Sequence, residues 1–175
     1  MKVFWLFGRS GAGKTTLAQG LYRALSDRKV PAFYLDGDEM RSGLCADLAF
    51  TPEARMENHR RIAEVARLAA EQNLNVIVST MAPQHGQRDV VAKVLGARLV
   101  WIYVHAPLEV CIQRDPKGLY HRAQEGKLDQ LLNFPFDVPR PHEREYFIDT
   151  VAQNVAGASQ TILELVRGRL SDCAI

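Results

Sequence analysis

The chain of 175 residues is 47% hydrophobic and 24% charged, values typical of one folded domain with a single core. Its 22 basic and 20 acidic residues nearly balance, which excludes the strongly basic surface of a general nucleic-acid-binding protein. No apolar run approaches the roughly 20 residues of a membrane span, and the N-terminus lacks the apolar stretch of a signal peptide. Three widely spaced cysteines (Cys45, Cys111, Cys173) indicate reduced thiols. We therefore expect one domain over residues 1–175, cytoplasmic and without nucleic-acid or membrane partners.

Short runs rich in Val, Ile, Phe, Tyr and Trp alternate along the chain with amphipathic stretches. The expected strands cover Lys2–Phe7, Ala32–Leu35, Asn75–Thr80, Leu99–His105 and Tyr146–Asp149. The expected helices cover Lys14–Arg28, Pro52–Gln72 and Ala152–Arg169. Strands that alternate with helices predict a three-layer α/β fold, in which helices cover both faces of a mostly parallel five-stranded sheet.

A glycine-rich segment, Gly8-Arg9-Ser10-Gly11-Ala12-Gly13-Lys14-Thr15, directly follows the first expected strand. It matches G-x-x-x-x-G-K-[ST] at every position, and it lies between a strand and a helix as the motif requires. Glycines let successive backbone N–H groups point at phosphate oxygens, and the helix that follows adds its positive N-terminal dipole. We expect Lys14 to reach the β- and γ-phosphates of ATP and the Thr15 hydroxyl to hold Mg²⁺. The candidate ATP-binding residues in this phosphate loop are Gly8, Ser10, Gly11, Ala12, Gly13, Lys14, Thr15 and Thr16.

Two carboxylates, Asp36 and Asp38, stand at the end of the second expected strand. In a doubly wound sheet this strand end faces the same crevice as the phosphate loop. A carboxylate there can orient an acceptor hydroxyl, take its proton or hold a Mg²⁺-bound water; capping a helix or filling a turn is the alternative. The third strand ends in Ser79-Thr80, without the carboxylate that motor and switch proteins usually carry. The pattern therefore favours phosphoryl transfer to a small molecule.

From Phe4 to about Thr150 the chain resembles the adenylylsulfate kinase family, with motifs in the same order. Leu35-Asp36-Gly37-Asp38 followed by Arg41, Gly43 and Leu44 is similar to the family's L-D-G-D-x-x-R-x-G-L. The family's next block and its lid entry are matched by Asp47–Phe50, Arg55–Ala66 and Arg114–Tyr120. The resemblance implies a P-loop kinase fold with a mobile lid at about 114–137, and a homodimer. It also implies ATP- and Mg²⁺-dependent phosphorylation of the 3′-hydroxyl of a small-molecule nucleotide, adenosine 5′-phosphosulfate (APS).

The resemblance assigns the acceptor nucleotide to a group of four residues. Arg41, Arg55 and Asn58 would hold it, and Phe50 would stack on its adenine. Arg55 and Asn58 are three residues apart and share a helical face. For Phe50, a position in the core is the alternative. Met81 is a further candidate for contact with the substrate.

The same resemblance assigns the chemistry to the lid and to the second strand end. Arg114 and Lys117 would close over ATP, and Lys117 would also contact the substrate and supply charge to the transferred phosphoryl group. Asp38 is the first candidate for acting on the acceptor hydroxyl and Asp36 the second. With Lys14, these are the candidate catalytic residues.

Two segments depart from the family pattern. Where the family has Phe-Ile-Ser-Pro, the chain has Thr80-Met81-Ala82-Pro83, so a phosphoserine at position 82 is excluded. The family's Phe-Thr-Gly element is replaced around Leu131-Leu132-Asn133, which leaves Leu131, Phe134 or Phe136 to cover the acceptor base. The alternatives are a kinase for another nucleotide-linked compound, such as cytidine diphosphoramidate, and a non-catalytic nucleotide-binding regulatory module.

Other polar residues carry weaker expectations. The five histidines lack metal-ligand spacing and are interpreted as surface or strand-end residues. Arg88 is interpreted either as facing the substrate or as a solvated residue at the start of a helix. Trp5 and Trp101 lie in expected strands and are predicted to be core residues.

Overall fold

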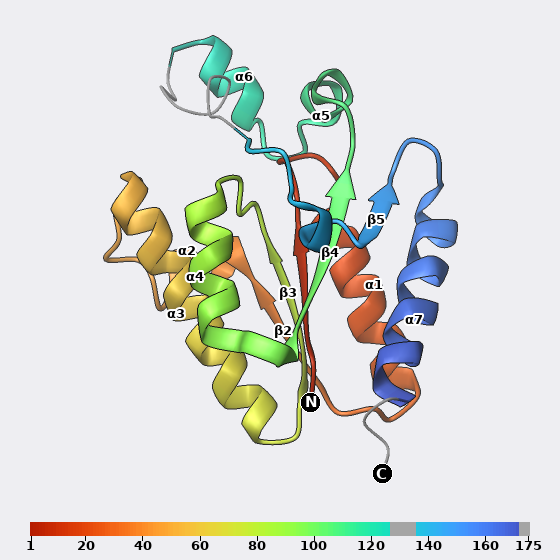
Figure 1. The fold of residues 1–175 in the computed structure, drawn as a ribbon. Helices are drawn as coiled ribbons and strands as arrows, with labels where there is room; N and C mark the ends of the chain where they lie inside the picture. Colours follow the sequence, from red (N-terminus) through yellow and green to blue (C-terminus); the bar gives the residue numbers. More distant parts are fainter. Residues whose placement is uncertain (127–135, 172–175) are drawn as a thin grey trace.

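The computed structural model describes residues 1–126 and 136–171, and within them the strands form one parallel sheet (Figure 1). The sheet order is β2-β3-β1-β4-β5, and the α/β fold class is confirmed. The strands are β1 (Val3–Phe7), β2 (Ala32–Asp36), β3 (Asn75–Thr80), β4 (Leu99–His105) and β5 (Tyr146–Asp149).

Helices cover both faces of the sheet, and this is why the central strand β1 is apolar and buried throughout (Figure 1). On β1, Phe4 and Leu6 pack with α1 (Lys14–Asp27) and α7 (Val155–Ser171). The alternate residues, Val3, Trp5 and Phe7, pack with α3 (Pro52–Glu71) and α4 (His85–Leu95). Trp5 is fully buried and Trp101 is 6% exposed, as expected of core residues.

The main helices begin and end close to their expected positions. Pro52 opens α3, and the Thr51 hydroxyl accepts a hydrogen bond from the Ala54 N–H. The helix α7 begins at Val155, three residues later than expected, because the Asp149 carboxylate accepts hydrogen bonds from the N–H groups of Val151 and Ala152 and holds a turn there.

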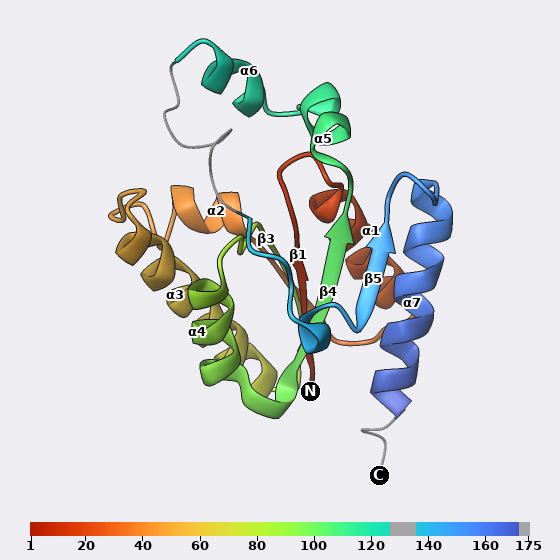
Figure 2. The same ribbon diagram turned by 45° about the horizontal axis from the view of Figure 1, so that its top comes forward.

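Shorter elements complete the layer at the carboxyl ends of the strands. They are α2 (Gly37–Ser42), α5 (Leu108–Arg114) and α6 (Leu119–Gln124), whereas the 3₁₀ turns Gly96–Arg98 and Pro141–Glu143 precede β4 and β5 at the opposite edge of the sheet. Figure 2 shows α5 and α6 above the carboxyl ends of β1 and β4, where the phosphate loop also lies. Within the described residues, no helix has both the length and the apolar character needed to span a membrane.

Candidate functional site

The phosphate loop has a backbone that only glycine fits at two positions. Gly11 has a φ of 77°, and a Cβ there would lie 2.7 Å from the carbonyl oxygen of Cys111. At Gly8 a Cβ would lie 2.1 Å from the Val104 carbonyl oxygen. The loop therefore packs directly against the backbone of β4 and of α5, at the carboxyl end of the sheet.

Lys14 folds back over this loop. Its Nζ donates a hydrogen bond to the Arg9 carbonyl oxygen at 2.7 Å. Desolvation in the loop and then the nearby Lys117 lower the pKa of Lys14 to about 8. Because burial and a neighbouring cation destabilise the Lys14 ammonium, an anionic ligand beside it would be favourable.

Asp36 is the N-cap of α2, so the capping alternative for this residue is realised. Its Oδ1 accepts a hydrogen bond from the Asp38 N–H at 2.9 Å, and its Oδ2 lies 3.2 Å from the Thr15 hydroxyl. Burial opposes ionisation of Asp36, but hydrogen bonds from the Asp38 N–H, Tyr34 and Ser79 outweigh it and hold the pKa of this carboxyl below its usual value. Asp36 is therefore an ionised and fully engaged carboxylate beside the phosphate loop.

Asp38 differs from Asp36 in its exposure and its partner. Its carboxylate forms an ion pair with Lys117, which lies between α5 and α6. The side chains of Asp38 and Lys117 are 69% and 46% exposed. The structure thus brings two of the predicted catalytic residues together at the mouth of the site.

The predicted acceptor-binding residues also gather. Phe50 is 62% exposed, which excludes the core alternative. The guanidinium carbons of Arg41 and Arg55 lie 4.9 Å and 5.4 Å from the centroid of its ring. Asn58 is only 4% exposed, and its Oδ1 accepts no hydrogen bond from the described residues.

One cavity of about 1200 Å³ connects the phosphate loop with the predicted acceptor-binding residues. The predicted residues that line it are Ser10, Gly11, Gly13, Lys14, Thr15, Thr16, Asp36, Asp38, Arg41, Phe50, Arg55, Asn58, Met81, Arg114 and Lys117. Two candidates from the phosphate loop do not line it. Ala12 is fully buried in the core, and Gly8 packs beneath the loop against Val104, so both shape the loop without facing the cavity.

Sequence reasoning missed several lining residues. Thr150 and Gln153 follow β5 and line the same cavity as Arg114. Arg114 donates hydrogen bonds to the hydroxyl and the carbonyl oxygen of Thr150 at 2.8 Å and 2.9 Å. Their position directly after a strand, at the carboxyl edge of the sheet, is the signal that points to them.

The described part of the lid is anchored to the phosphate loop. The Tyr120 hydroxyl, on α6, donates a hydrogen bond to the Ser10 carbonyl oxygen at 3.1 Å. Asp115 accepts hydrogen bonds from the N–H groups of Tyr120 and His121 at 3.2 Å and 3.0 Å and so begins α6. The Asp-Pro-Lys-Gly-Leu-Tyr segment therefore carries Lys117 on a turn that is fixed at both ends.

The altered acceptor-base element lies outside the described residues, since Leu131, Asn133 and Phe134 all fall within 127–135. Phe136 is described. Its ring stacks on Tyr103 at a centroid distance of 6.1 Å and lies under the Arg9 guanidinium, 5.0 Å away. Phe136 does not line the cavity formed by the described residues. It thus joins the end of the lid to β4 and to the phosphate loop.

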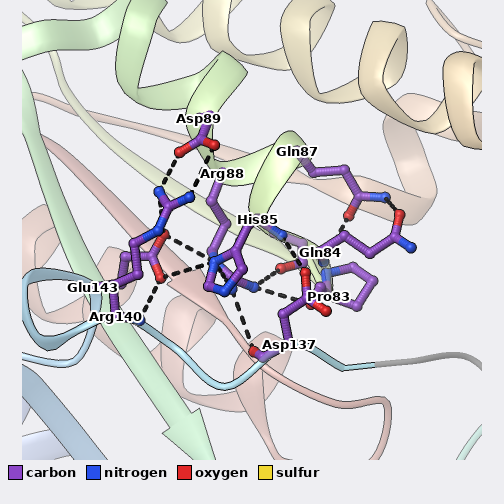
Figure 3. Close-up of polar contacts among 10 residues, drawn as sticks. Pro83, Gln84, His85, Gln87, Arg88, Asp89, Asp137, Arg140 and Glu143 are labelled. Carbon is purple, nitrogen blue, oxygen red and sulfur yellow. Dashed lines mark hydrogen bonds and ion pairs between the residues drawn. The ribbon is translucent and has the colours of Figure 1, made fainter.

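Arg88 is neither solvated nor turned toward the substrate, so both interpretations of it are wrong. It is fully buried, and Figure 3 shows its guanidinium between the start of α4 and the segment that follows the lid. It donates to the carbonyl oxygens of Ala82 and Pro83 at 2.8 Å and 3.0 Å, and its Nε lies 3.1 Å from Glu143 Oε1. The His85 N–H donates to Asp137 at 2.7 Å in the same cluster. Arg88 therefore anchors the far end of the lid to the end of β3.

His59 is not a surface residue either. It is 6% exposed, its ring stacks on Trp5 at 6.3 Å, and its Nδ1 lies 2.8 Å from the Arg55 carbonyl oxygen. Burial lowers the pKa of His59 to about 4, so the ring is neutral near pH 7. By contrast, the His121 side chain is 72% exposed, as expected.

Comparisons with known proteins agree with this geometry. The family described as adenylylsulphate kinase matches residues 1–149. An adenylyl-sulfate kinase of Paraburkholderia xenovorans is 41% identical over 172 residues, which cover 97% of this chain and 96% of that protein. One from Pseudomonas aeruginosa is 41% identical over 153 residues, 87% and 78% of the two chains. Among solved structures, the Mycobacterium tuberculosis APS kinase in complex with AMPPNP and APS has a TM-score of 0.89 at 32% identity, covering 95% of this chain and 97% of that one.

Proposed function

The chain belongs to the adenylylsulphate kinase family, and we propose that it transfers the γ-phosphoryl group of ATP to the 3′-hydroxyl of APS. The observation that carries this proposal is one cavity of about 1200 Å³ lined both by the phosphate loop and by the group of Arg41, Phe50, Arg55 and Asn58. Such a cavity suits two nucleotides. The Mycobacterium tuberculosis relative, solved with APS and with AMPPNP, an ATP analogue, supports the same interpretation.

The phosphate loop fits the triphosphate of ATP. Its backbone curls tightly at Gly11 (φ 77°) and Gly13 (φ 97°), and Lys14 lies over it with a lowered pKa that a phosphate would restore. The Thr15 hydroxyl is a hard oxygen group that suits Mg²⁺, and it lies 3.2 Å from Asp36 Oδ2. When bound, Mg²⁺ would supply positive charge that offsets the negative charge of the phosphates. Thr150 and Gln153, beside Arg114, would flank the adenosine of ATP.

The part of the cavity around Phe50 offers an acceptor nucleotide an aromatic face and two guanidinium groups. The exposed Phe50 ring suits a purine base, and Arg41 and Arg55 suit the paired oxygens of a phosphosulfate. Both guanidinium groups lie near the ring, and we propose that they turn onto the phosphosulfate when the base stacks. The buried Asn58 Oδ1 is an acceptor for a donor group of the ligand.

The ion pair between Asp38 and Lys117 supports a role for both residues in the transfer step. Asp38 takes the proton from the 3′-hydroxyl while the oxygen bonds to the γ-phosphorus and the bond to the β-bridging oxygen breaks, releasing ADP. Lys117 then neutralises charge on the transferred phosphoryl group, and to do so its ammonium leaves the ion pair with Asp38. All the oxygens of Asp36 are engaged by protein donors, so its role is to hold the loop and α2.

An acceptor assay tests the proposal. The protein is incubated with Mg·ATP and either APS or cytidine diphosphoramidate, and ADP and the phosphorylated acceptor are both quantified. We expect turnover with APS and none with the cytidine compound. Turnover with the cytidine compound alone would reassign the acceptor, and turnover with neither would favour a non-catalytic nucleotide-binding module.

We also propose that the chain is one domain over residues 1–175 and a homodimer in the cytoplasm. Two hydrophobic clusters that share one sheet support the single domain. Buried, unpaired Cys45 and Cys111 support a reducing compartment, and the family resemblance supports the dimer. Sedimentation equilibrium tests the dimer, because a single species of monomer mass at micromolar concentration would overturn it.

A further inference from the structure

Tyr34 belongs to no motif of the sequence, yet it contacts the carboxylate nearest the phosphate loop. Its hydroxyl donates a hydrogen bond to Asp36 Oδ2 at 2.8 Å. The Ser79 hydroxyl donates to the same oxygen, also at 2.8 Å, and lies 3.0 Å from the Tyr34 oxygen. The third group on this oxygen is the Thr15 hydroxyl, at 3.2 Å.

The sheet holds this arrangement in place. Tyr34 and Asp36 are two residues apart on β2 and so point to the same face, while Ser79 is the register partner of Asp36 on β3. The Tyr34 ring is half-buried and packs against Tyr22 of α1 at a centroid distance of 6.3 Å. Burial raises the pKa of the Tyr34 phenol, so it stays protonated and remains a donor.

The contacts have a consequence for Thr15. A hydroxyl has one proton and two lone pairs, so a proton directed at Asp36 leaves the lone pairs of Thr15 for a cation. Asp36 can receive that proton only while its carboxylate keeps its orientation, and Tyr34 and Ser79 make the shorter contacts that fix Oδ2. Groups that orient a metal ligand in this way typically tune metal affinity.

We propose that Tyr34 is a positioning residue which, through Asp36, orients the Thr15 hydroxyl toward the Mg²⁺ that accompanies the nucleotide. This inference rests on the proposed binding of Mg·ATP at the phosphate loop. It adds a residue from β2 to a site otherwise built from the loop and the strand ends.

ADP binding measured by calorimetry with Mg²⁺ and with EDTA tests the inference, because the ratio of the two affinities isolates the metal's contribution. We expect Tyr34→Phe to lower this ratio about tenfold, at the low end of the usual range because Ser79 remains. Its metal-free ADP affinity should match that of the unaltered protein. Tyr22→Phe, which removes a hydroxyl from the neighbouring ring, is the matched control and should change neither affinity.

Two results would overturn the inference: an unchanged ratio in Tyr34→Phe, or an equal loss of ADP affinity with and without Mg²⁺, which indicates a merely structural role. If Tyr34→Phe does not fold, Ser79→Ala is measured in its place. It removes another short hydrogen bond to Asp36 Oδ2, and the same ratio of ADP affinities with and without Mg²⁺ decides the test. The measurement needs no acceptor. A protein that binds Mg·ADP but leaves APS unphosphorylated would contradict the proposed function without affecting this test.

Discussion

Lys117, on the turn between α5 and α6, forms an ion pair with Asp38 of α2 although the two residues are 79 positions apart in the chain. Both side chains remain largely exposed, and exposed ion pairs contribute little to folding stability. The pair therefore matters for what it brings together: the lid and the second strand end, over the cavity that the phosphate loop also lines.

Asp38→Asn should lower kcat by about 100-fold or more, because the amide cannot take the acceptor proton. Its melting temperature and its KM for ATP should stay close to those of the unaltered protein. Lys117→Ala should also lower kcat, whereas Lys93→Ala, an exposed lysine on α4, should leave it unchanged. Steady-state kinetics measure all three, and wild-type kcat in Asp38→Asn would remove this residue from the transfer step.

Phe50→Ala should raise KM for APS about tenfold, because stacking of a base on an aromatic ring is lost. The ring is 62% exposed, so neither the melting temperature nor the KM for ATP should change. Leu44→Ala is the matched control, since this residue is 57% exposed and lies outside the cavity. An equal rise in both KM values would show that Phe50 supports the whole site and not the acceptor alone.

Nucleotide affinity should depend on pH through Lys14. Its pKa is about 8, below the ordinary value of 10.5, so the neutral amine gains population as the pH rises through 8. Phosphates favour the ammonium form, so ADP affinity should fall over this range and binding at about pH 8.5 should take up a proton. Calorimetry in buffers of different ionisation enthalpy measures that uptake. Lys14→Arg, which keeps its charge, should show none.

His59 should make the protein sensitive to acid. Its pKa is about 4 in the folded state, below the ordinary value of 6.5, so the unfolded chain binds the extra proton between these values and stability falls as the pH drops. Between pH 7 and pH 5 this costs about 2 kcal/mol. His59→Leu should lose that part of the pH dependence, measured by urea unfolding at both pH values. His121→Ala, at an exposed position, should keep it.

Arg88→Ala should lower the free energy of unfolding by about 3–5 kcal/mol, because it leaves the Glu143 carboxylate, 1% exposed, buried without its partner. Arg140→Ala removes the exposed ion pair with Asp89 and a longer contact with Glu143 at 3.7 Å, and it should cost less than Arg88→Ala because Arg88 still pairs with Glu143. Urea unfolding compares the two variants. Equal losses would contradict the assignment of Arg88 as the anchor of this segment.

The features that sequence predicts well are local ones. The phosphate loop and the β-strands depend on neighbouring residues, and all five strands and helices α1 and α3 begin and end within a residue of expectation. The interpretation of His59 as a surface residue is wrong, and it arises because charged residues surround His59 in the chain. Helical spacing places it with Ile62, Ala63 and Ala66 on the buried face of α3, so the signal was present.

Contacts between distant segments were not predictable. Arg88 and Glu143 are separated by the lid, and the short hydrophilic run around Arg88 gives no sign that β3, α4 and the 3₁₀ turn enclose it. The same holds for Tyr120 on the Ser10 carbonyl and for Tyr34 on Asp36, which depend on the three-dimensional path of the backbone. The roles that we propose for Asp36 and Asp38 likewise depend on their exposures and partners in the fold.

The most direct test of the central claim is to identify the product of one reaction. The protein, Mg·ATP and APS are mixed, and the nucleotides are resolved by mass spectrometry and phosphorus NMR. We predict equal amounts of ADP and a product phosphorylated at the 3′-hydroxyl of APS, and none with Asp38→Asn over the same time. ADP formed with free inorganic phosphate and unchanged APS would contradict the account.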